Sequence, residues 1–208
     1  MVKISRSNSV VKVEIPTFNL KYFDEFFKLK CRDDLLQTGW YNKPKEITES
    51  MAMFNAYRKY FKFLHDKNCL IMVVGDGVYP RTGCLFAFRT KHTIISIDPL
   101  LREVYTNVER LICIPETIEK AELKNYLSLY KPEYILLVFC HSHASLSSSV
   151  AKVEESAFLG KIKLQGLYII SMPCCIKDDL KIIKPVVSYT DFGVYSDKNI
   201  INIYKIYG

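Results

Sequence analysis

The sequence predicts an α/β fold, in which helices cover both faces of a mostly parallel β-sheet. Three observations carry this prediction. From residue 69 onwards, short apolar runs rich in β-branched residues alternate with longer amphipathic segments. The first two runs end in a Gly-x-Gly turn and in an aspartate, as the strands of a nucleoside-binding βαβ unit do. The last two runs lie too close together in the chain for a crossover helix.

The apolar runs predict five parallel strands, at residues 69–74, 93–97, 110–114, 134–140 and 166–172. Two of them are almost continuously apolar, which is typical of strands buried on both faces of a sheet. The segments between the strands predict helices at residues 81–90, 100–106, 117–129 and 147–160. Two final runs, at residues 186–189 and 200–206, are predicted to form an antiparallel pair at the end of the chain.

The first 47 residues lack this regular pattern. We expect residues 1–47 to form an N-terminal extension packed on the core, and residues 48–208 to form one domain. Within the extension, residues 10–15 alternate like a short strand, and residues 20–29 place three phenylalanines on one face of a helix. Residues 48–65 carry apolar side chains at three- and four-residue steps, which predicts an amphipathic helix before the first central strand.

The composition is that of a globular protein with a sizeable core. Of the 208 residues, 49% are hydrophobic and 25% are charged. Seven cysteines are scattered through apolar runs, which favours reduced core residues over a disulfide framework. The apolar runs are shorter than the roughly 18 residues that cross a membrane. We therefore expect an intracellular, cytoplasmic protein without a membrane partner.

The net charge of +7 has two open explanations. It favours RNA or another polyanion as a partner. A lysine surface that only keeps the protein soluble explains the charge equally well.

The turn after the first central strand reads Gly75-Asp76-Gly77, and the second strand ends at Asp98. Glycines at a strand end let the backbone turn sharply and approach a ligand, and a carboxylate on the next strand can accept hydrogen bonds from a ribose. The third glycine comes only at Gly83. This spacing argues against a nicotinamide dinucleotide, whose pyrophosphate needs a third glycine three residues after the second.

Five parallel strands, this turn and the antiparallel tail together resemble the seven-stranded Rossmann-like fold of S-adenosylmethionine-dependent methyltransferases. The resemblance implies that Gly75, Asp76 and Gly77 hold the methionine part of S-adenosylmethionine and that Asp98 holds its ribose. The family often has an acidic residue where this chain has Val73.

An unusual Pro-Arg-Thr insertion follows the glycine turn. The carboxylate of the cofactor is therefore expected near Arg81, or at a helix N-terminus that Thr82 caps. The resemblance also implies that Glu116 lies near the adenine of the cofactor. The helix dipole explains an acidic residue in the first turn of a predicted helix equally well.

Catalytic residues are expected after the fourth strand, where the chain reads Cys-His-Ser-His. An imidazole of His141 or His143 can act as a general base near neutral pH. A Pro-Cys-Cys sequence follows the fifth strand, and it resembles a branch of the family that includes tRNA 2′-O-methyltransferases. Cys174 and Cys175 could join the two histidines as metal ligands, but adjacent cysteines suit one ion poorly, so no metal site is predicted.

These observations predict a methyltransferase that uses S-adenosylmethionine and acts on RNA or another nucleic acid. The alternative is a catalytically inactive methyltransferase-like protein that serves as a scaffold for nucleic acid or protein partners.

Overall fold

The computed structural model describes residues 3–7, 10–14, 19–102, 108–174, 179–180 and 183–208. Its centre is a seven-stranded sheet in the order β5-β4-β3-β6-β7-β9-β8. The strands are β3 (Cys69–Val74), β4 (Thr93–Ile97), β5 (Leu111–Ile114), β6 (Tyr134–Cys140), β7 (Gly166–Met172), β8 (Val187–Thr190) and β9 (Ile200–Tyr207).

The pairing confirms the predicted sheet. The five strands from β3 to β7 are parallel to their neighbours, whereas β9 runs antiparallel to both β7 and β8. The first crossover starts from β3 in the middle of the sheet, so the chain winds outwards first to one side and then to the other. This reversal places the carboxyl ends of β3 and β6 side by side, which is where open α/β sheets bind ligands.

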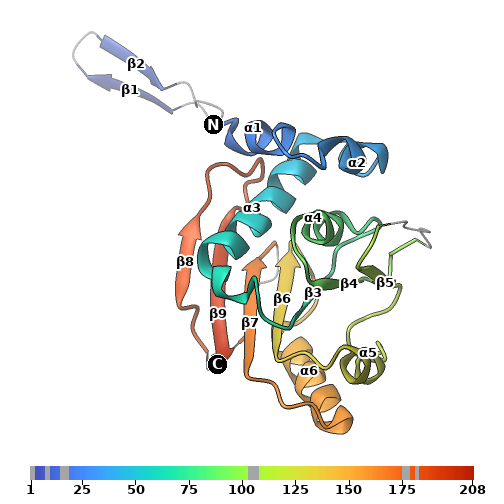
Figure 1. Cartoon of the computed structure of the whole chain (residues 1–208). Coiled ribbons are helices and arrows are strands. Elements are labelled where there is room, and N and C mark those ends of the chain that lie inside the picture. Colours follow the sequence, from blue (N-terminus) through green and yellow to red (C-terminus); the bar gives the residue numbers. More distant parts are fainter. Residues whose placement is uncertain (1–2, 8–9, 15–18, 103–107, 175–178, 181–182) are drawn as a thin grey trace.

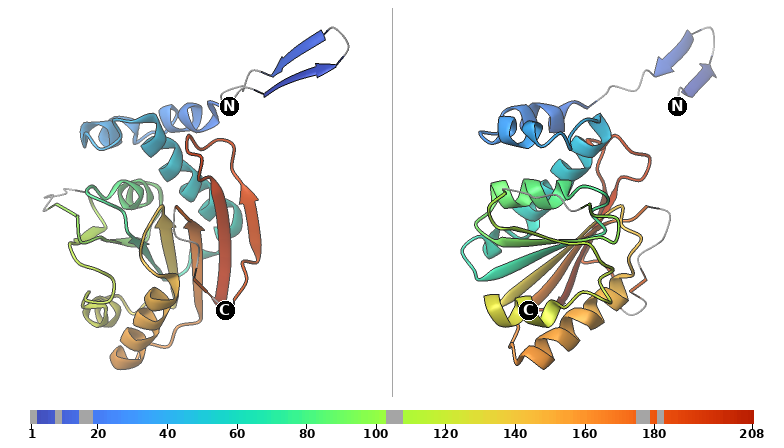
Figure 2. Two further views of the ribbon diagram at one scale, coloured as in Figure 1. Left: turned by 180° about the vertical axis from the view of Figure 1, so that it is seen from behind. Right: turned by 90° about the vertical axis from the view of Figure 1, so that its right-hand side faces the viewer.

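Helices cover both faces of the sheet, as predicted. Helices α3 (Pro44–Tyr60) and α4 (Arg81–Arg89) lie on one face, and α5 (Leu123–Tyr130) and α6 (Leu146–Gly160) lie on the other (Figures 1 and 2). Alternate residues of β3 point to opposite faces. Ile71 and Val73 join the core under α3 and α4, while Leu70 and Met72 join the core over α5 and α6.

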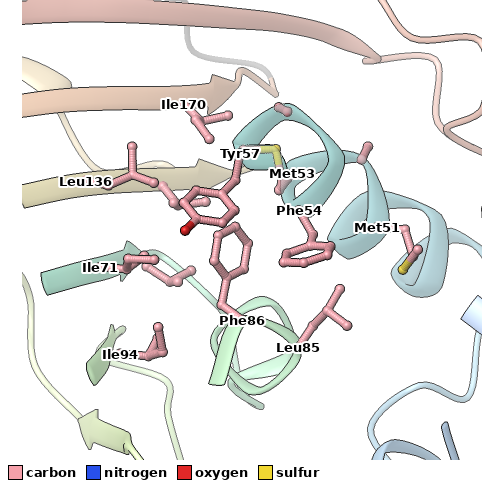
Figure 3. Packing of buried hydrophobic residues seen from close by; sticks show 14 of the residues in the cluster. Met51, Met53, Phe54, Tyr57, Ile71, Leu85, Phe86, Ile94, Leu136 and Ile170 are labelled. Atoms are coloured by element: carbon pink, nitrogen blue, oxygen red, sulfur yellow. The ribbon is translucent and has the colours of Figure 1, made fainter. Parts of the chain in front are cut away.

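The core on the α3 side is rich in aromatic rings. Figure 3 shows Phe54 and Tyr57 of α3 packed against Phe86 of α4, above the β-branched side chains of the sheet. The rings of Phe54 and Phe86 meet edge to face, with centroids 5.5 Å apart. Such packing fixes α3 firmly on the sheet, and α3 therefore presents its polar residues in defined positions.

Three predicted helices differ from the structure. Helix α5 begins at Leu123 and not at residue 117, because residues 118–120 form a turn first. The predicted helix at 100–106 begins in a turn at Pro99 and Leu100, and residues 103–107 lie outside the described part of the chain. Helix α3 begins at Pro44, before the predicted residue 48, because proline suits the first position of a helix.

The N-terminal segment contains a hairpin, β1 (Lys3–Ser7) with β2 (Val10–Glu14), and two short helices, α1 (Lys21–Phe27) and α2 (Arg32–Gln37). The predicted apolar face of α1 was partly wrong. Tyr22 and Phe26 are buried in the core under α3, whereas Phe27 is exposed. Trp40 and Tyr41, which follow α2, are also buried there.

The described cysteines are free, and of these Cys69 and Cys84 are buried in the core. Among the described residues, no helix combines the length and the apolar character that a membrane crossing needs.

Candidate functional site

The glycine turn after β3 packs directly against the loop after β6. Gly75 and Gly77 both have positive φ angles, of +75° and +81°, which favour glycine. A Cβ on Gly75 would lie only 2.1 Å from the Oγ of Ser142. A Cβ on Gly77 would meet no close neighbour, so Gly77 is required for its backbone conformation alone.

Asp76 points away from the ligand side of this turn. Its carboxylate is 7% exposed and accepts hydrogen bonds from the backbone of Thr82 and Gly83 and from the Oγ of Ser96, at 3.0, 2.9 and 2.8 Å. Burial raises the pKa of Asp76, and these hydrogen bonds offset only part of that effect. Asp76 therefore holds the start of α4 against β4, and the structure does not bring it to the cavity.

Arg81 and Thr82 are also turned away from the cavity. The Arg81 guanidinium lies 3.1 Å from the Glu46 carboxylate of α3, and the hydroxyl of Tyr41 donates a hydrogen bond to the Arg81 carbonyl. Thr82 is buried, with its Oγ1 3.4 Å from the Oγ of Ser50. Both residues tie α4 to α3 and to the N-terminal segment.

A cavity of about 720 Å³ lies at the carboxyl ends of β3, β4 and β6. Of the residues that the sequence singled out, six line it: Gly75, Gly77, Asp98, Glu116, His141 and His143. The cavity therefore joins loops that follow four different strands. Its volume is in the range of pockets that bind small molecules and cofactors.

Asp98 lines this cavity and also accepts hydrogen bonds from the backbone of two of the loops around it. Its Oδ2 accepts a hydrogen bond from the Gly77 backbone at 2.9 Å, and its Oδ1 accepts one from the Leu100 backbone at 2.7 Å. A carboxylate can accept about four hydrogen bonds, so each oxygen retains acceptor capacity for a ligand. Asp98 thus fixes the glycine turn relative to β4 and still offers two acceptors.

The charges around the cavity are acidic. Asp98, Glu116 and Glu119 line it together with two histidines, and its described lining contains no lysine or arginine. Glu116 and Glu119 are exposed at the rim. Such a cavity favours a cationic ligand and disfavours a phosphate.

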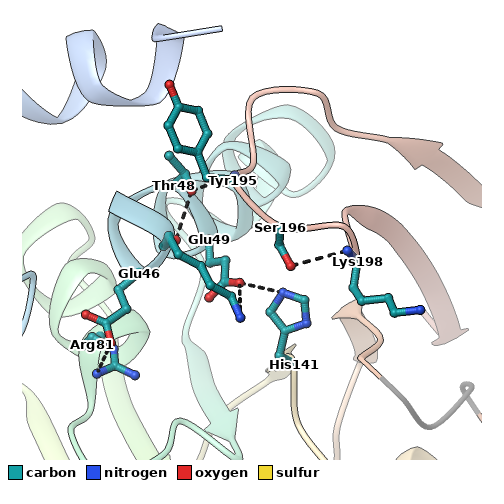
Figure 4. Close-up of polar contacts among 9 residues, drawn as sticks. Glu46, Thr48, Glu49, Arg81, His141, Tyr195, Ser196 and Lys198 are labelled. Atoms are coloured by element: carbon teal, nitrogen blue, oxygen red, sulfur yellow. Dashed lines mark hydrogen bonds and ion pairs between the residues drawn. The ribbon is translucent and has the colours of Figure 1, made fainter. Parts of the chain in front are cut away.

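His141 lies at the junction between the cavity and α3. Its Nε2 lies 2.8 Å from the Oε1 of Glu49 without forming an aligned hydrogen bond, and both of its ring nitrogens are buried with no hydrogen-bond partner among the described residues. The Nζ of Lys45, one turn before Glu49 on α3, lies 3.6 Å from the same oxygen. Figure 4 shows the imidazole of His141 directed at the Glu49 carboxylate.

The backbone of His141 is in a conformation that few residues adopt. Its φ angle is +52°, in the left-handed region, and its side chain is only 12% exposed. Strain of this kind costs on the order of 1–3 kcal/mol and is common at functional sites. His143, two residues later, is exposed at the cavity.

Sequence reasoning missed Glu49. The sequence carried only a weak signal, a carboxylate two residues before the apolar run 51–54 of the helix, and Glu49 is only 9% exposed in the structure. The contact with His141 arises from the packing of α3 over the carboxyl end of β6, which no local pattern encodes.

The cysteines near this site do not provide an obvious reactive group. Burial, with the carboxylates of Glu49 and Asp76 nearby, raises the pKa of Cys140, so its thiol stays protonated at neutral pH. Among the described residues, no three His, Cys, Asp or Glu side chains are grouped as metal ligands. Cys174 is a free cysteine, and Cys175 lies outside the described residues.

Comparison of the sequence with family models finds no match, and no curated protein sequence matches either. Solved structures with a similar fold exist. A variant of the nicotianamine synthase MtNAS in complex with S-adenosylmethionine aligns over 89% of this chain and 70% of its own, with a TM-score of 0.52 and 9% identity. MtNAS in complex with MTA and tNA aligns over 91% and 69%, with a TM-score of 0.52 and 9% identity.

The plantazolicin methyltransferase BpumL, in complex with a desmethylPZN analog and SAH, aligns less completely. It covers 71% of this chain and 56% of its own, with a TM-score of 0.36 and 11% identity. Identities this low bear on the fold alone. The strand order and the two MtNAS alignments together show that the chain has a seven-stranded Rossmann-like α/β fold, with five parallel strands and an antiparallel terminal pair.

Proposed function

We propose that this protein is a methyltransferase that binds S-adenosylmethionine in the cavity between β3, β4 and β6. The acidic lining of the cavity carries the proposal. S-adenosylmethionine has a sulfonium cation and no phosphate, so Asp98, Glu116 and Glu119 favour it. A nicotinamide dinucleotide would instead place a pyrophosphate in this cavity. The described residues that line the cavity include no lysine or arginine to bind it. The complex of the similarly folded MtNAS variant with S-adenosylmethionine supports the same choice.

The residues present fit this cofactor. Asp98 can accept hydrogen bonds from a ribose diol, since each of its oxygens uses only one acceptor position within the protein. Gly77 lines the cavity and has no side chain of its own, so a ligand can come close to its backbone. Glu116 is at the rim, where it can meet the polar edge of a base.

When bound, the cofactor supplies an electrophilic methyl group. The chain must then position a nucleophile and accept its proton. His141 suits this role, because its Nε2 faces Glu49 and its Nδ1 has no partner among the described residues. In the tautomer with the proton on Nε2, Nδ1 can act as the acceptor, and because Nδ1 is buried the ring must turn towards the cavity before a nucleophile reaches it. His143 is a second candidate base at the same cavity.

Calorimetric titration with S-adenosylmethionine, S-adenosylhomocysteine and NAD tests the cofactor. We expect micromolar binding of the first two only, and a loss of at least tenfold in affinity for Asp98→Ala, which removes a charge-assisted hydrogen-bond acceptor. His141→Ala and His143→Ala should retain binding, and the variant of the true base should lose turnover. Binding of NAD alone, or wild-type affinity in Asp98→Ala, would contradict the proposal.

The acceptor that we propose is RNA or another nucleic acid, which agrees with the net charge of +7 and with an intracellular, cytoplasmic protein. Binding that weakens steeply with salt would support a nucleic-acid acceptor. Analysis of the products of turnover would separate S-adenosylhomocysteine, the product of methyl transfer, from 5′-methylthioadenosine, the product of transfer of the aminocarboxypropyl group.

A catalytically inactive scaffold for nucleic acid or protein partners is the second candidate. Asp76, Arg81 and Thr82 favour it, because all three are engaged within the protein and do not line the cavity. An absence of binding to all three titrants would support the scaffold.

A further inference from the structure

One arginine at the edge of the cofactor cavity takes no part in the site described so far. Arg102 is exposed and follows β4, two residues after Leu100, which lines the cavity. Its backbone amide donates a hydrogen bond to the Val78 carbonyl at 3.2 Å, directly after the cavity-lining Gly77. The loop after β4 is thus tied to the turn after β3, and this contact places Arg102 beside the mouth of the cavity.

Two aromatic rings support the side chain of Arg102. Its guanidinium carbon lies over the ring of Tyr79, 5.8 Å from the centroid, and its Nη1 donates a long hydrogen bond of 3.4 Å to the Tyr79 hydroxyl. The ring of Tyr79 stacks on that of Trp40, with centroids 6.1 Å apart and planes inclined by 15°. Trp40 is buried, so this Arg102 stack is anchored in the core. A long side chain that is already held in place loses less conformational entropy when it binds a ligand.

Arg102 also lacks an acidic partner. The arginines that pair with carboxylates are Arg32, Arg58, Arg81 and Arg110. Arg89 is half-buried and lies over the ring of Phe54. Among the described residues, Arg102 pairs with no carboxylate, so its charge is available to a ligand. The planar guanidinium of an arginine suits two oxygens of a phosphate.

The acidic residues of the cavity lie towards the other face of the sheet. Glu116 and Glu119 follow β5, and the intervening Ile118 packs in the core over α5 and α6. The Arg102 stack instead packs on the core under α3 and α4. A phosphate is therefore disfavoured within the acidic cavity and favoured at Arg102 outside it.

We propose that Arg102 binds a phosphate of the RNA acceptor, next to the nucleotide that is methylated. The reacting atom of that nucleotide must enter the cavity to meet the cofactor, whereas the neighbouring phosphate stays outside. Arg102 binds this phosphate at the mouth, and Tyr79 holds the guanidinium in position. The inference rests on the proposed function, because it gives the RNA acceptor a point of attachment beside an acidic cavity.

Fluorescence anisotropy with a labelled single-stranded oligoribonucleotide, between about 50 and 200 mM salt, tests the proposal in the full-length protein. One phosphate contact to a single strand adds about 0.7 to the slope of log K against log salt, which is a factor of about five in affinity near 0.1 M. We expect Arg102→Gln to lose both. Arg102→Lys keeps the charge and should keep the slope.

The matched control is Arg58→Gln, which lowers the net charge by the same amount. Arg58 is also exposed, and its guanidinium carbon also lies 5.8 Å from the centroid of an aromatic ring, that of Phe54. It differs in pairing with Glu25, at 3.8 Å. Arg58→Gln should therefore bind the oligoribonucleotide like the wild type.

Equal affinity and salt slope in Arg102→Gln and Arg58→Gln would overturn the phosphate assignment. A slope that falls as far in Arg102→Lys as in Arg102→Gln would do the same, because the charge would then not be what binds. Displacement by polyglutamate as effective as by unlabelled RNA, at equal charge, would indicate an acidic protein in place of RNA and would also overturn it.

Titration of the variants with S-adenosylhomocysteine separates this proposal from the proposed function. We expect wild-type affinity in Arg102→Gln and in Arg58→Gln, since neither side chain lines the cavity. Loss of the RNA contact alone therefore leaves cofactor binding intact. A protein that binds the oligoribonucleotide through Arg102 but binds no S-adenosylhomocysteine would overturn the proposed function, and Arg102 would remain as an RNA contact.

Discussion

Replacing Asp76 with alanine is expected to destabilise the fold strongly. The substitution leaves three donors without an acceptor in the protein interior: the backbone amides of Thr82 and Gly83 and the hydroxyl of Ser96. Each buried donor left unpaired costs about 1–3 kcal/mol. Water can enter the vacated space, and the cost of burying the charge disappears, so we expect a net loss of about 3–5 kcal/mol. This is a large share of the roughly 5–15 kcal/mol by which domains are stable.

Urea-induced unfolding, followed by circular dichroism at pH 7, measures this loss. Asp98→Ala is the matched control, because Asp98 also accepts two backbone hydrogen bonds but lies at the cavity, where water can replace it. We expect Asp98→Ala to lose less than about 2 kcal/mol. Asp76→Asn keeps the volume and one acceptor oxygen, so its stability should lie between those of Asp76→Ala and the wild type.

The result that would refute the reasoning is equal stability of Asp76→Ala and Asp98→Ala. The carboxylate of Asp76 would then not be what holds α4 to β4. Titration of the folded variants with S-adenosylhomocysteine adds a second contrast, since Asp98→Ala should lose more affinity than Asp76→Asn.

Three further predictions follow from particular contacts. Burial and the nearby His65 lower the pKa of His92 to about 4, whereas the unfolded chain binds this proton near pH 6.5. Stability should therefore fall by about 2 kcal/mol as the pH drops from 6.5 to 4, and urea unfolding of His92→Gln should show a smaller drop. Gly75→Ala, whose Cβ would lie 2.1 Å from Ser142, should cost about 3 kcal/mol or more, against about 1–2 kcal/mol for Gly77→Ala, by the same assay. Tyr22→Phe removes the hydrogen bond to Asp191 and should lower the thermal stability of the protein; an unchanged melting temperature would mean that this contact does not hold the β8–β9 loop to α1.

The strands were predictable because their signal is local. Residues 69–74, 134–140 and 166–172 are β3, β6 and β7 to the residue, since each is an almost continuously apolar run bounded by polar or turn residues. The start of α5 was not predictable in this way. Residues 117–122 contain charged residues that suit a helix or a turn equally, and tertiary packing decides between them.

The site was predictable only where the backbone alone decides it. A positive φ at Gly75 and Gly77 follows from glycine at a strand end, and Asp98 follows from its place at the next strand end. The direction of the Asp76 side chain depends on the twist of the turn, which points the carboxylate at Ser96 beneath it. The sequence offers no sign of that direction, because an aspartate between two glycines suits either side of the turn.

The N-terminal segment is where the fold and the proposed chemistry depend on each other. Tyr22 and Phe26 complete the core under α3, and the same helix α1 holds the β8–β9 loop through Asp191. Helix α3 in turn carries Glu49 to His141. A Rossmann-like sheet alone supplies the acidic cofactor cavity, since its walls come from the strand ends. The carboxylate beside the proposed base needs α3 as well, so substitutions in this helix should affect turnover before they affect cofactor binding.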